Sequence, residues 1–180
     1  MMTVLSLCDY SGAWSAPYAE AGYDVVRIDL QHGKDVRLFE ALPFPVRGIL
    51  AAPPCTHLAS SGARWWAEKG DVKLLEALAV VDACLRIIMV HRPQWWALEN
   101  PVGRLRTYLG EPTMAFDPAD YGDPYTKRTL LWGRFNKPMM APVEAVLGSA
   151  MWKLPPSPDR QNKRSQTPKG FARAFYEANP

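Results

Sequence analysis

The stretch Gly48-Ile49-Leu50-Ala51-Ala52-Pro53-Pro54-Cys55-Thr56 decides which fold we expect. A short apolar run that two prolines close is typical of a buried strand that ends abruptly. In open α/β folds, ligands bind beyond the carboxyl ends of the strands, so Cys55 is placed where a ligand would bind. A lone cysteine is more often a small buried hydrophobic residue, and that interpretation stays open at this point.

A second apolar run ends in the same way. Trp95-Trp96-Ala97-Leu98 is followed at once by Glu99-Asn100-Pro101. A thiol and a carboxylate at neighbouring strand ends would supply a nucleophile and a proton donor. The structural alternative is that Glu99 is a helix N-terminal carboxylate and that Asn100-Pro101 only starts a helix.

Strands and helices alternate along the rest of the chain. We expect strands at 3–7, 24–29, 47–52, 95–98 and 129–132, and helices at 13–22, 36–42, 72–91, 102–109 and 168–178. This alternation predicts an α/β fold with a Rossmann-like, mostly parallel sheet and helices on both faces. We expect residues 1–136 to form the catalytic domain, with 137–180 as a proline-rich basic tail that ends in a helix and packs on the same domain.

Composition limits the class of protein. A chain of 180 residues, 48% hydrophobic and 22% charged, suits one globular domain. Three cysteines and three histidines are too scattered for a disulfide framework or a zinc site, so we expect no metal. No apolar run approaches membrane-spanning length and the start of the chain lacks a basic leader region, so a cytoplasmic protein without membrane contact is expected.

The charge is unevenly distributed. Residues 151–180 hold six Lys or Arg against two Asp or Glu, whereas the other 150 residues hold 15 basic and 16 acidic groups. Such a basic tail could bind phosphates, or it could be a solvated segment that charge keeps soluble.

The first turn suggests a cofactor site. The strand at 3–7 leads into the small-residue loop Asp9-Tyr10-Ser11-Gly12, which opens a helix. Backbone amides in such a loop can approach a ligand closely, and Asp29 at the next strand end is where a carboxylate would bind ribose hydroxyls. By itself, Gly12 is equally compatible with a structural turn.

The order of these blocks resembles the cytosine-C5 DNA methyltransferases, which use S-adenosylmethionine. Pro53-Pro54-Cys55 resembles their Pro-Cys block, and Trp96-Ala97-Leu98-Glu99-Asn100 resembles their Glu-Asn block. Weaker similarities are found in the cofactor block from Leu5 to Asp29, in Asp35-Val36-Arg37, in Tyr121-Gly122-Asp123-Pro124, and in the segment from Arg164 to Arg173.

The resemblance implies DNA as the partner, S-adenosylmethionine as the cofactor, and the fold of the methyltransferases that use it. It implies that Cys55 adds to C6 of cytosine and that Glu99 acts as the acid at N3. Cofactor contacts are then expected from Asp9, Tyr10, Ser11, Gly12, Asp29, Asp35 and Pro53. Substrate contacts are expected from Asn100, Lys127, Arg128 and Arg164.

The chain also departs from the family pattern. Tyr125, Lys127 and Thr129 stand where the family has a glutamine and two arginines. The stretch between Thr129 and Arg164 is too short for a target-recognition lobe, which favours a small, single-lobed member of the phage or prophage type. Two alternatives remain: C5 modification of a free nucleotide, RNA or a single strand, and a catalytically inert module that binds DNA or a protein partner.

Overall fold

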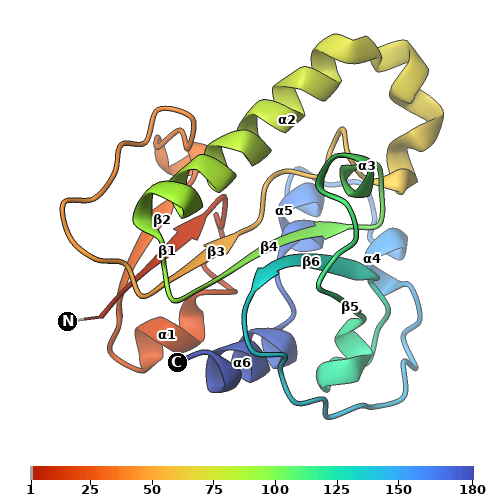
Figure 1. The fold of residues 1–180 in the computed structure, drawn as a ribbon. Coiled ribbons are helices and arrows are strands. Elements are labelled where there is room, and N and C mark those ends of the chain that lie inside the picture. The colour runs from red at the N-terminus through yellow and green to blue at the C-terminus, as the bar shows by residue number, and fades with distance from the viewer. Residues whose placement is uncertain (1) are drawn as a thin grey trace.

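Six strands form one sheet in the order β2-β1-β3-β4-β6-β5 (Figure 1). The computed structural model describes residues 2–180, apart from the side chain of Trp152. The strands are β1 (Thr3–Leu7), β2 (Asp24–Ile28), β3 (Gly48–Ala51), β4 (Trp95–Pro101), β5 (Met114–Phe116) and β6 (Thr129–Arg134). The five predicted strands are therefore confirmed to within three residues at each end, and β5 was not predicted.

The sheet is mixed, not wholly parallel. β2, β1, β3 and β4 are parallel to their neighbours, as expected, but β6 pairs antiparallel with both β4 and β5. The expected mostly parallel sheet is thus observed in β2, β1, β3 and β4, whereas the strand expected at 129–132 is antiparallel to its neighbours. The composition of a strand does not fix its direction; the connection does, and β5 returns to β6 without the crossover helix that parallel neighbours require.

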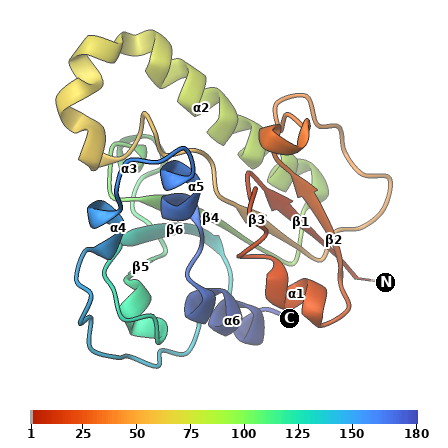
Figure 2. The same cartoon turned by 180° about the vertical axis from the view of Figure 1, so that it is seen from behind.

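Each face of the sheet has its own hydrophobic core. Leu5, Ile49 and Leu98 point to the face that α2 (Trp66–His91) covers. Val4 and Leu50 point to the other face, where α1 (Ala16–Glu20) and α6 (Lys169–Ala178) lie (Figures 1 and 2). Successive strand residues alternate between faces, so a strand buried on both sides is apolar throughout. Helices on both faces are therefore confirmed.

The helices differ more from expectation than the strands do. The expected helix at 13–22 is only the five residues of α1, and the one at 102–109 is only α3 (Leu105–Leu109). Residues 36–42 hold a turn and no helix: the N–H groups of Leu38 and Phe39 bond three residues back, to Asp35 and Val36, and Pro43 follows shortly afterwards. α2 begins six residues early and is interrupted at Gly70, whose φ is 65°.

Short helical segments complete the fold. Two were not predicted, α4 (Ala150–Lys153) and α5 (Arg160–Ser165), whereas the last helix is confirmed as α6. The 3-10 turns are η1 (Leu30–His32), η2 (Ser60–Trp65) and η3 (Pro118–Tyr121). No helix in residues 2–180 has the length and apolarity needed to cross a membrane.

Aromatic rings attach α6 to the sheet. Phe171 stacks on Phe116 of β5 with ring centroids 3.9 Å apart, and Phe175 meets Trp14 edge-on at 5.6 Å. The Tyr18 hydroxyl donates to the Asn179 carbonyl at 2.9 Å. The end of the chain is thus part of the hydrophobic core.

Shortening Phe171 to alanine should therefore destabilise the whole fold. We expect Phe171→Ala to lower the free energy of unfolding by about 3–5 kcal/mol, because it removes a fully buried ring from a packed layer. Phe44→Ala is the matched control, since Phe44 is 44% exposed and should cost less than about 1 kcal/mol. Equal losses in urea unfolding of the two variants would contradict this packing.

Candidate active site

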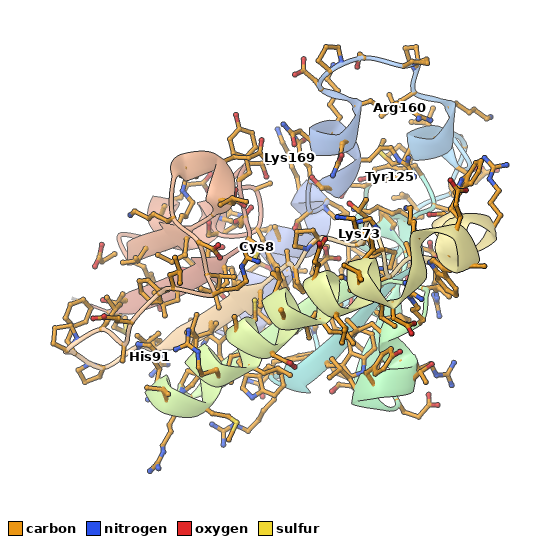
Figure 3. All side chains as sticks on the ribbon, turned by 90° about the horizontal axis from the view of Figure 1, so that it is seen from above. Cys8, Lys73, His91, Tyr125, Arg160 and Lys169 are labelled. Atoms are coloured by element: carbon orange, nitrogen blue, oxygen red, sulfur yellow. The ribbon has the colours of Figure 1, made fainter. Side chains whose placement is uncertain are left out.

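The carboxyl ends of the parallel strands meet at one edge of the sheet. Asp9 follows β1, Asp29 follows β2, Cys55 comes four residues after β3, and Glu99 lies within β4, two residues before its end. Since β6 runs the other way, it starts at this edge, just after Lys127 and Arg128. In Figure 3, Cys8, Tyr125, Arg160 and Lys169 lie around this side of the molecule. The topology thus gathers the predicted residues from distant parts of the chain.

A buried hydrogen bond joins the two strand ends that carry Cys55 and Glu99. Asn100 is fully buried, and its Nδ2 donates to the Pro53 carbonyl at 2.9 Å. The bond fixes the turn before Cys55 against the residue after Glu99. Asn100 thus positions the two strand ends relative to each other, and the Pro53 carbonyl accepts the hydrogen bond that does so.

Residues 103–104 clamp the loop that follows Cys55, and sequence reasoning missed both. Gly103 pairs with Ala59 in an isolated antiparallel bridge, and a Cβ on Gly103 would overlap the Leu58 carbonyl oxygen. Arg104 donates from its backbone N–H to Leu58 and from Nε to His57, both at 2.9 Å. A glycine and an arginine just beyond Glu-Asn-Pro-Val were the only signals, and neither shows its contacts without the fold.

Charges of both signs act on Cys55. Burial raises the pKa of the Cys55 thiol, and the Glu99 carboxylate raises it further. Lys127 and Arg164 lower that pKa, because a cation favours the thiolate. The charges of all three side chains therefore act on the thiol.

Glu99 is suited to hold a proton. Burial raises the pKa of its carboxyl, with a further contribution from the charge of Asp9, while Lys127 opposes the shift. A desolvated carboxyl remains protonated to higher pH than a solvated one, as a general acid requires.

The loop after β1 is organised around Asp9. Its carboxylate is buried and accepts hydroxyl hydrogen bonds from Ser6 at 2.8 Å, Ser15 at 3.0 Å and Ser11 at 3.3 Å. Gly12 has a φ of 69°, which glycine adopts without strain. Ser6 and Ser15 were missed, since a serine in a strand or turn carries no distinctive pattern.

The other predicted cofactor residues lie around the β2 end of the edge. Asp29 accepts the Gln31 N–H at 2.8 Å with Oδ1, and Tyr10 is half-exposed with its ring 5.1 Å from His32. Asp35 lies on the following loop and is paired with Arg37 at 2.6 Å, so its carboxylate is already occupied.

Three predicted substrate residues lie at the end of this edge where β6 begins. Lys127 donates from Nζ to the Gln166 carbonyl at 3.2 Å, and Arg128 pairs with Asp117 at 3.3 Å. Arg164 belongs to α5 and its charge reaches Cys55.

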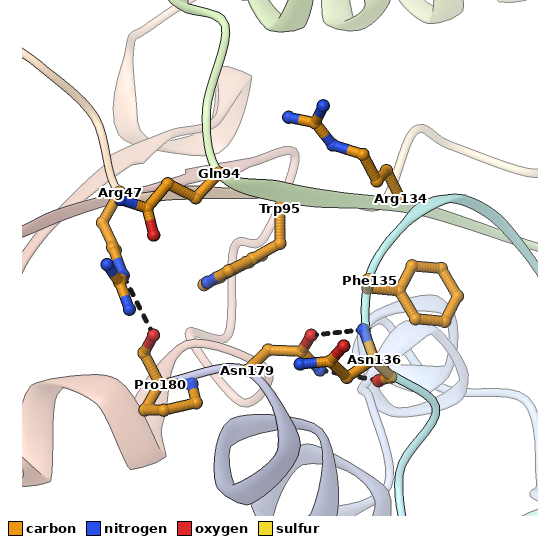
Figure 4. Close-up of a pocket in the computed structure, with 8 residues that line it drawn as sticks. All are labelled: Arg47, Gln94, Trp95, Arg134, Phe135, Asn136, Asn179 and Pro180. Atoms are coloured by element: carbon orange, nitrogen blue, oxygen red, sulfur yellow. Dashed lines mark hydrogen bonds between the residues drawn. The ribbon is translucent and has the colours of Figure 1, made fainter.

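A cavity of about 380 Å³ lies at the opposite, amino-terminal edge of the sheet (Figure 4). Arg47 donates to the Pro180 carbonyl at 3.0 Å, and the Asn179 side chain accepts the Asn136 N–H at 2.7 Å. The eight residues that line the cavity carry no thiol or carboxylate side chain. The nucleophile and the acid are therefore not in this cavity. Within residues 2–180, no group of three or more His, Cys, Asp or Glu could hold a metal ion.

Comparison with known proteins supports the fold. No family model and no curated protein matches the chain. Among solved structures, it is similar to an E. coli protein described as a "putative DNA modification methyltransferase encoded within prophage Cp", with a TM-score of 0.52 and 18% identity. The match covers 82% of this chain but 54% of that protein. The chain thus shares the fold of about half of that protein's length.

The close approach at Gly103 predicts a position-specific effect. Gly103→Ala should destabilise the protein and slow any reaction of Cys55, because the new Cβ would push the Leu58 carbonyl and the turn that Leu58 shares with Cys55. Gly62→Ala in the same loop has room, its nearest neighbour being 3.8 Å away, and should behave like wild type. Thermal melting and Cys55 alkylation rates compare the two; indistinguishable variants would exclude the clamp.

Neutralising the charges around Cys55 should change its reactivity in opposite directions. Glu99→Gln removes a negative charge and should lower the thiol pKa, so that iodoacetamide alkylates Cys55 faster at pH 7.5. Lys127→Gln removes a positive charge and should raise the pKa and slow alkylation, by up to about tenfold for each unit that the pKa moves. Peptide mass spectrometry isolates Cys55 from Cys8 and Cys84. Shifts of the same sign would show that these charges do not reach the thiol.

Proposed function

We propose that the protein methylates cytosine at C5 in DNA, using S-adenosylmethionine and a covalent adduct to Cys55. The observation that carries the proposal is the buried bond from Asn100 to Pro53, which holds a thiol and a desolvated carboxyl at adjacent strand ends. The shared fold with a solved protein described as a DNA modification methyltransferase supports it.

Cys55 would act as the nucleophile. Cytosine C5 is a poor nucleophile until a thiolate adds to C6, which forms an S–C6 bond and gives C5 carbanion character. Only the thiolate is competent, so the cations of Lys127 and Arg164 assist by lowering the thiol pKa. After C5 has gained the methyl group, loss of the C5 proton breaks the S–C6 bond and restores the ring.

Glu99 would protonate cytosine N3 as Cys55 adds. The addition places negative charge on the ring, and a proton at N3 neutralises it. The competent state therefore has Cys55 deprotonated and Glu99 protonated, so one proton is shared by the pair. The pH dependence of the reaction then belongs to the pair and to neither residue alone.

The residues at the ends of β1 and β2 fit the cofactor. Neither Asp9 nor Asp29 forms an ion pair with a described residue, and carboxylates suit a sulfonium, an ammonium and ribose hydroxyls. Asp29 would hold the ribose, and the loop Asp9-Tyr10-Ser11-Gly12 would line the methionine part. Asp35 would reach the adenine only by giving up Arg37. When bound, S-adenosylmethionine supplies an electrophilic methyl group.

A second candidate is C5 modification of a single strand or free nucleotide. Between β6 and α6, the described helical structure consists of α4 and α5, of four and six residues. Elements this short offer little surface for reading a duplex, and an unpaired base costs less to bring into an active site.

The adduct itself provides the test. An oligonucleotide with 5-fluorocytosine should form a stable complex with the wild-type protein and cofactor, because fluorine at C5 prevents the final elimination. Cys55→Ala should form none, and Glu99→Gln should slow adduct formation by about 10²–10⁴. Cys8→Ala, which removes the thiol at the end of β1, is the matched control and should retain the adduct. An undiminished adduct in Cys55→Ala on denaturing gels would refute the proposal, and a free 5-fluoro nucleotide in parallel separates the two substrate classes.

A further inference from the structure

The basic end of the sequence separates into two parts with different environments. α6 packs into the hydrophobic core through Phe171 and Phe175, and its Arg173 pairs with Glu20 at 3.3 Å. α5 instead lies at the carboxyl edge, beside the end of β4 and the start of β6 (Figure 2). It carries Arg160, Lys163 and Arg164 within six residues and no acidic residue. The charge of the tail that is not tied to the core is therefore concentrated next to the candidate site.

Polar side chains hold α5 across two loops of that site. Gln161 donates from Nε2 to the Thr56 hydroxyl at 3.3 Å, one residue from Cys55. The amides of Asn162 and Gln31 exchange hydrogen bonds at 3.3 and 3.4 Å, on the loop that follows Asp29. α5 thus connects the loop expected to hold the cofactor with the loop that holds the nucleophile.

The cations of this region form one group beside Cys55. Lys127 reaches the end of α5 through the Gln166 carbonyl, and both Lys127 and Arg164 act on the thiol. Lys163 is exposed on the same helix, and Arg128 at the start of β6 is also exposed. The carboxylates of Asp9 and Asp29 follow β1 and β2, and that of Glu99 lies near the end of β4, whereas the basic groups lie on α5 and just before β6.

We propose that α5 binds the sugar-phosphate backbone of the DNA strand that carries the target cytosine. This inference rests on the proposed function and concerns the part of the protein that holds its substrate. Six helical residues span about 9 Å, long enough to lie beside more than one phosphate, since each strand of duplex DNA carries one phosphate per about 3.4 Å of helix axis. Lys and Arg on phosphates position a strand without reading its bases. Binding therefore depends on salt and little on the sequence around the cytosine.

Lys163 allows a direct test, because it is exposed and not part of the catalytic group. Lys163→Gln removes one charge from α5; Lys137→Gln removes one charge from an exposed residue just beyond β6, at the opposite edge of the sheet. Affinity for a fluorescent 12-nucleotide single strand is measured by anisotropy between 50 and 300 mM NaCl for wild type, both variants and Lys163→Arg. Thermal melting verifies that each protein is folded.

We expect the slope of log affinity against log salt to fall in magnitude by about 0.7 in Lys163→Gln, the value for one phosphate contact on a single strand. Lys137→Gln and Lys163→Arg should keep the wild-type slope. The loss should be the same for strands of different sequence. Equal slopes in Lys163→Gln and Lys137→Gln, or a loss confined to one sequence, would overturn the inference.

The adduct experiment separates this inference from the function on which it rests. An adduct at Cys55 with an unchanged Lys163→Gln slope means that the chemistry stands and the strand is held elsewhere. A changed slope without any adduct in wild type means that α5 binds phosphates in a protein that does not modify cytosine. No binding of wild type to any strand at 50 mM NaCl would overturn the inference outright.

Discussion

The hydrogen bond from Asn100 to the Pro53 carbonyl is the constraint on which the candidate site depends. It is buried, so breaking it would leave two polar groups without partners, at a cost of about 1–3 kcal/mol for each. The buried Asn100 Oδ1 lacks a partner among the described residues, so the Nδ2 bond is the side-chain hydrogen bond through which Asn100 acts. It links the turn that follows β3 to the end of β4. The Gly103–Ala59 bridge and Arg104 extend the same link to the loop after Cys55.

The link between these two strand ends has an electrostatic consequence. Holding Cys55 near Glu99 raises the pKa of the thiol, which opposes the formation of a nucleophile. Lys127 lowers the pKa of both groups and so favours the thiolate while it disfavours the protonated acid. Of these two pKa values, Arg164 on α5 lowers only that of the Cys55 thiol. The balance at the site therefore includes a charge carried by the helix that we infer to hold the substrate.

The tryptophan in the loop after β1 packs into the hydrophobic core on the face of the sheet that α1 and α6 cover. Trp14 is fully buried against Phe171 and Phe175, so the loop after β1 is tied to α6 as well as to its own serines. This large ring occupies the core side of the loop, and Asp9, Ser11 and Gly12 are the residues of the loop that we propose to line the cofactor site.

The sequence by itself predicted every strand of the sheet except β5, the last helix, and the placement of Cys55 and Glu99 near strand ends. Those features follow from local patterns: apolar runs, prolines that end them, and helical spacing. It predicted a mostly parallel sheet and a helix at 36–42. The first holds for β2, β1, β3 and β4 but not for β6, because strand direction depends on the connection, and the second is wrong, since residues 36–42 hold a turn. Only the tertiary structure separated α5 from α6 within one basic tail and revealed Gly103 and Arg104 as a clamp. Their roles consist of contacts between residues more than 40 positions apart, which no local pattern encodes.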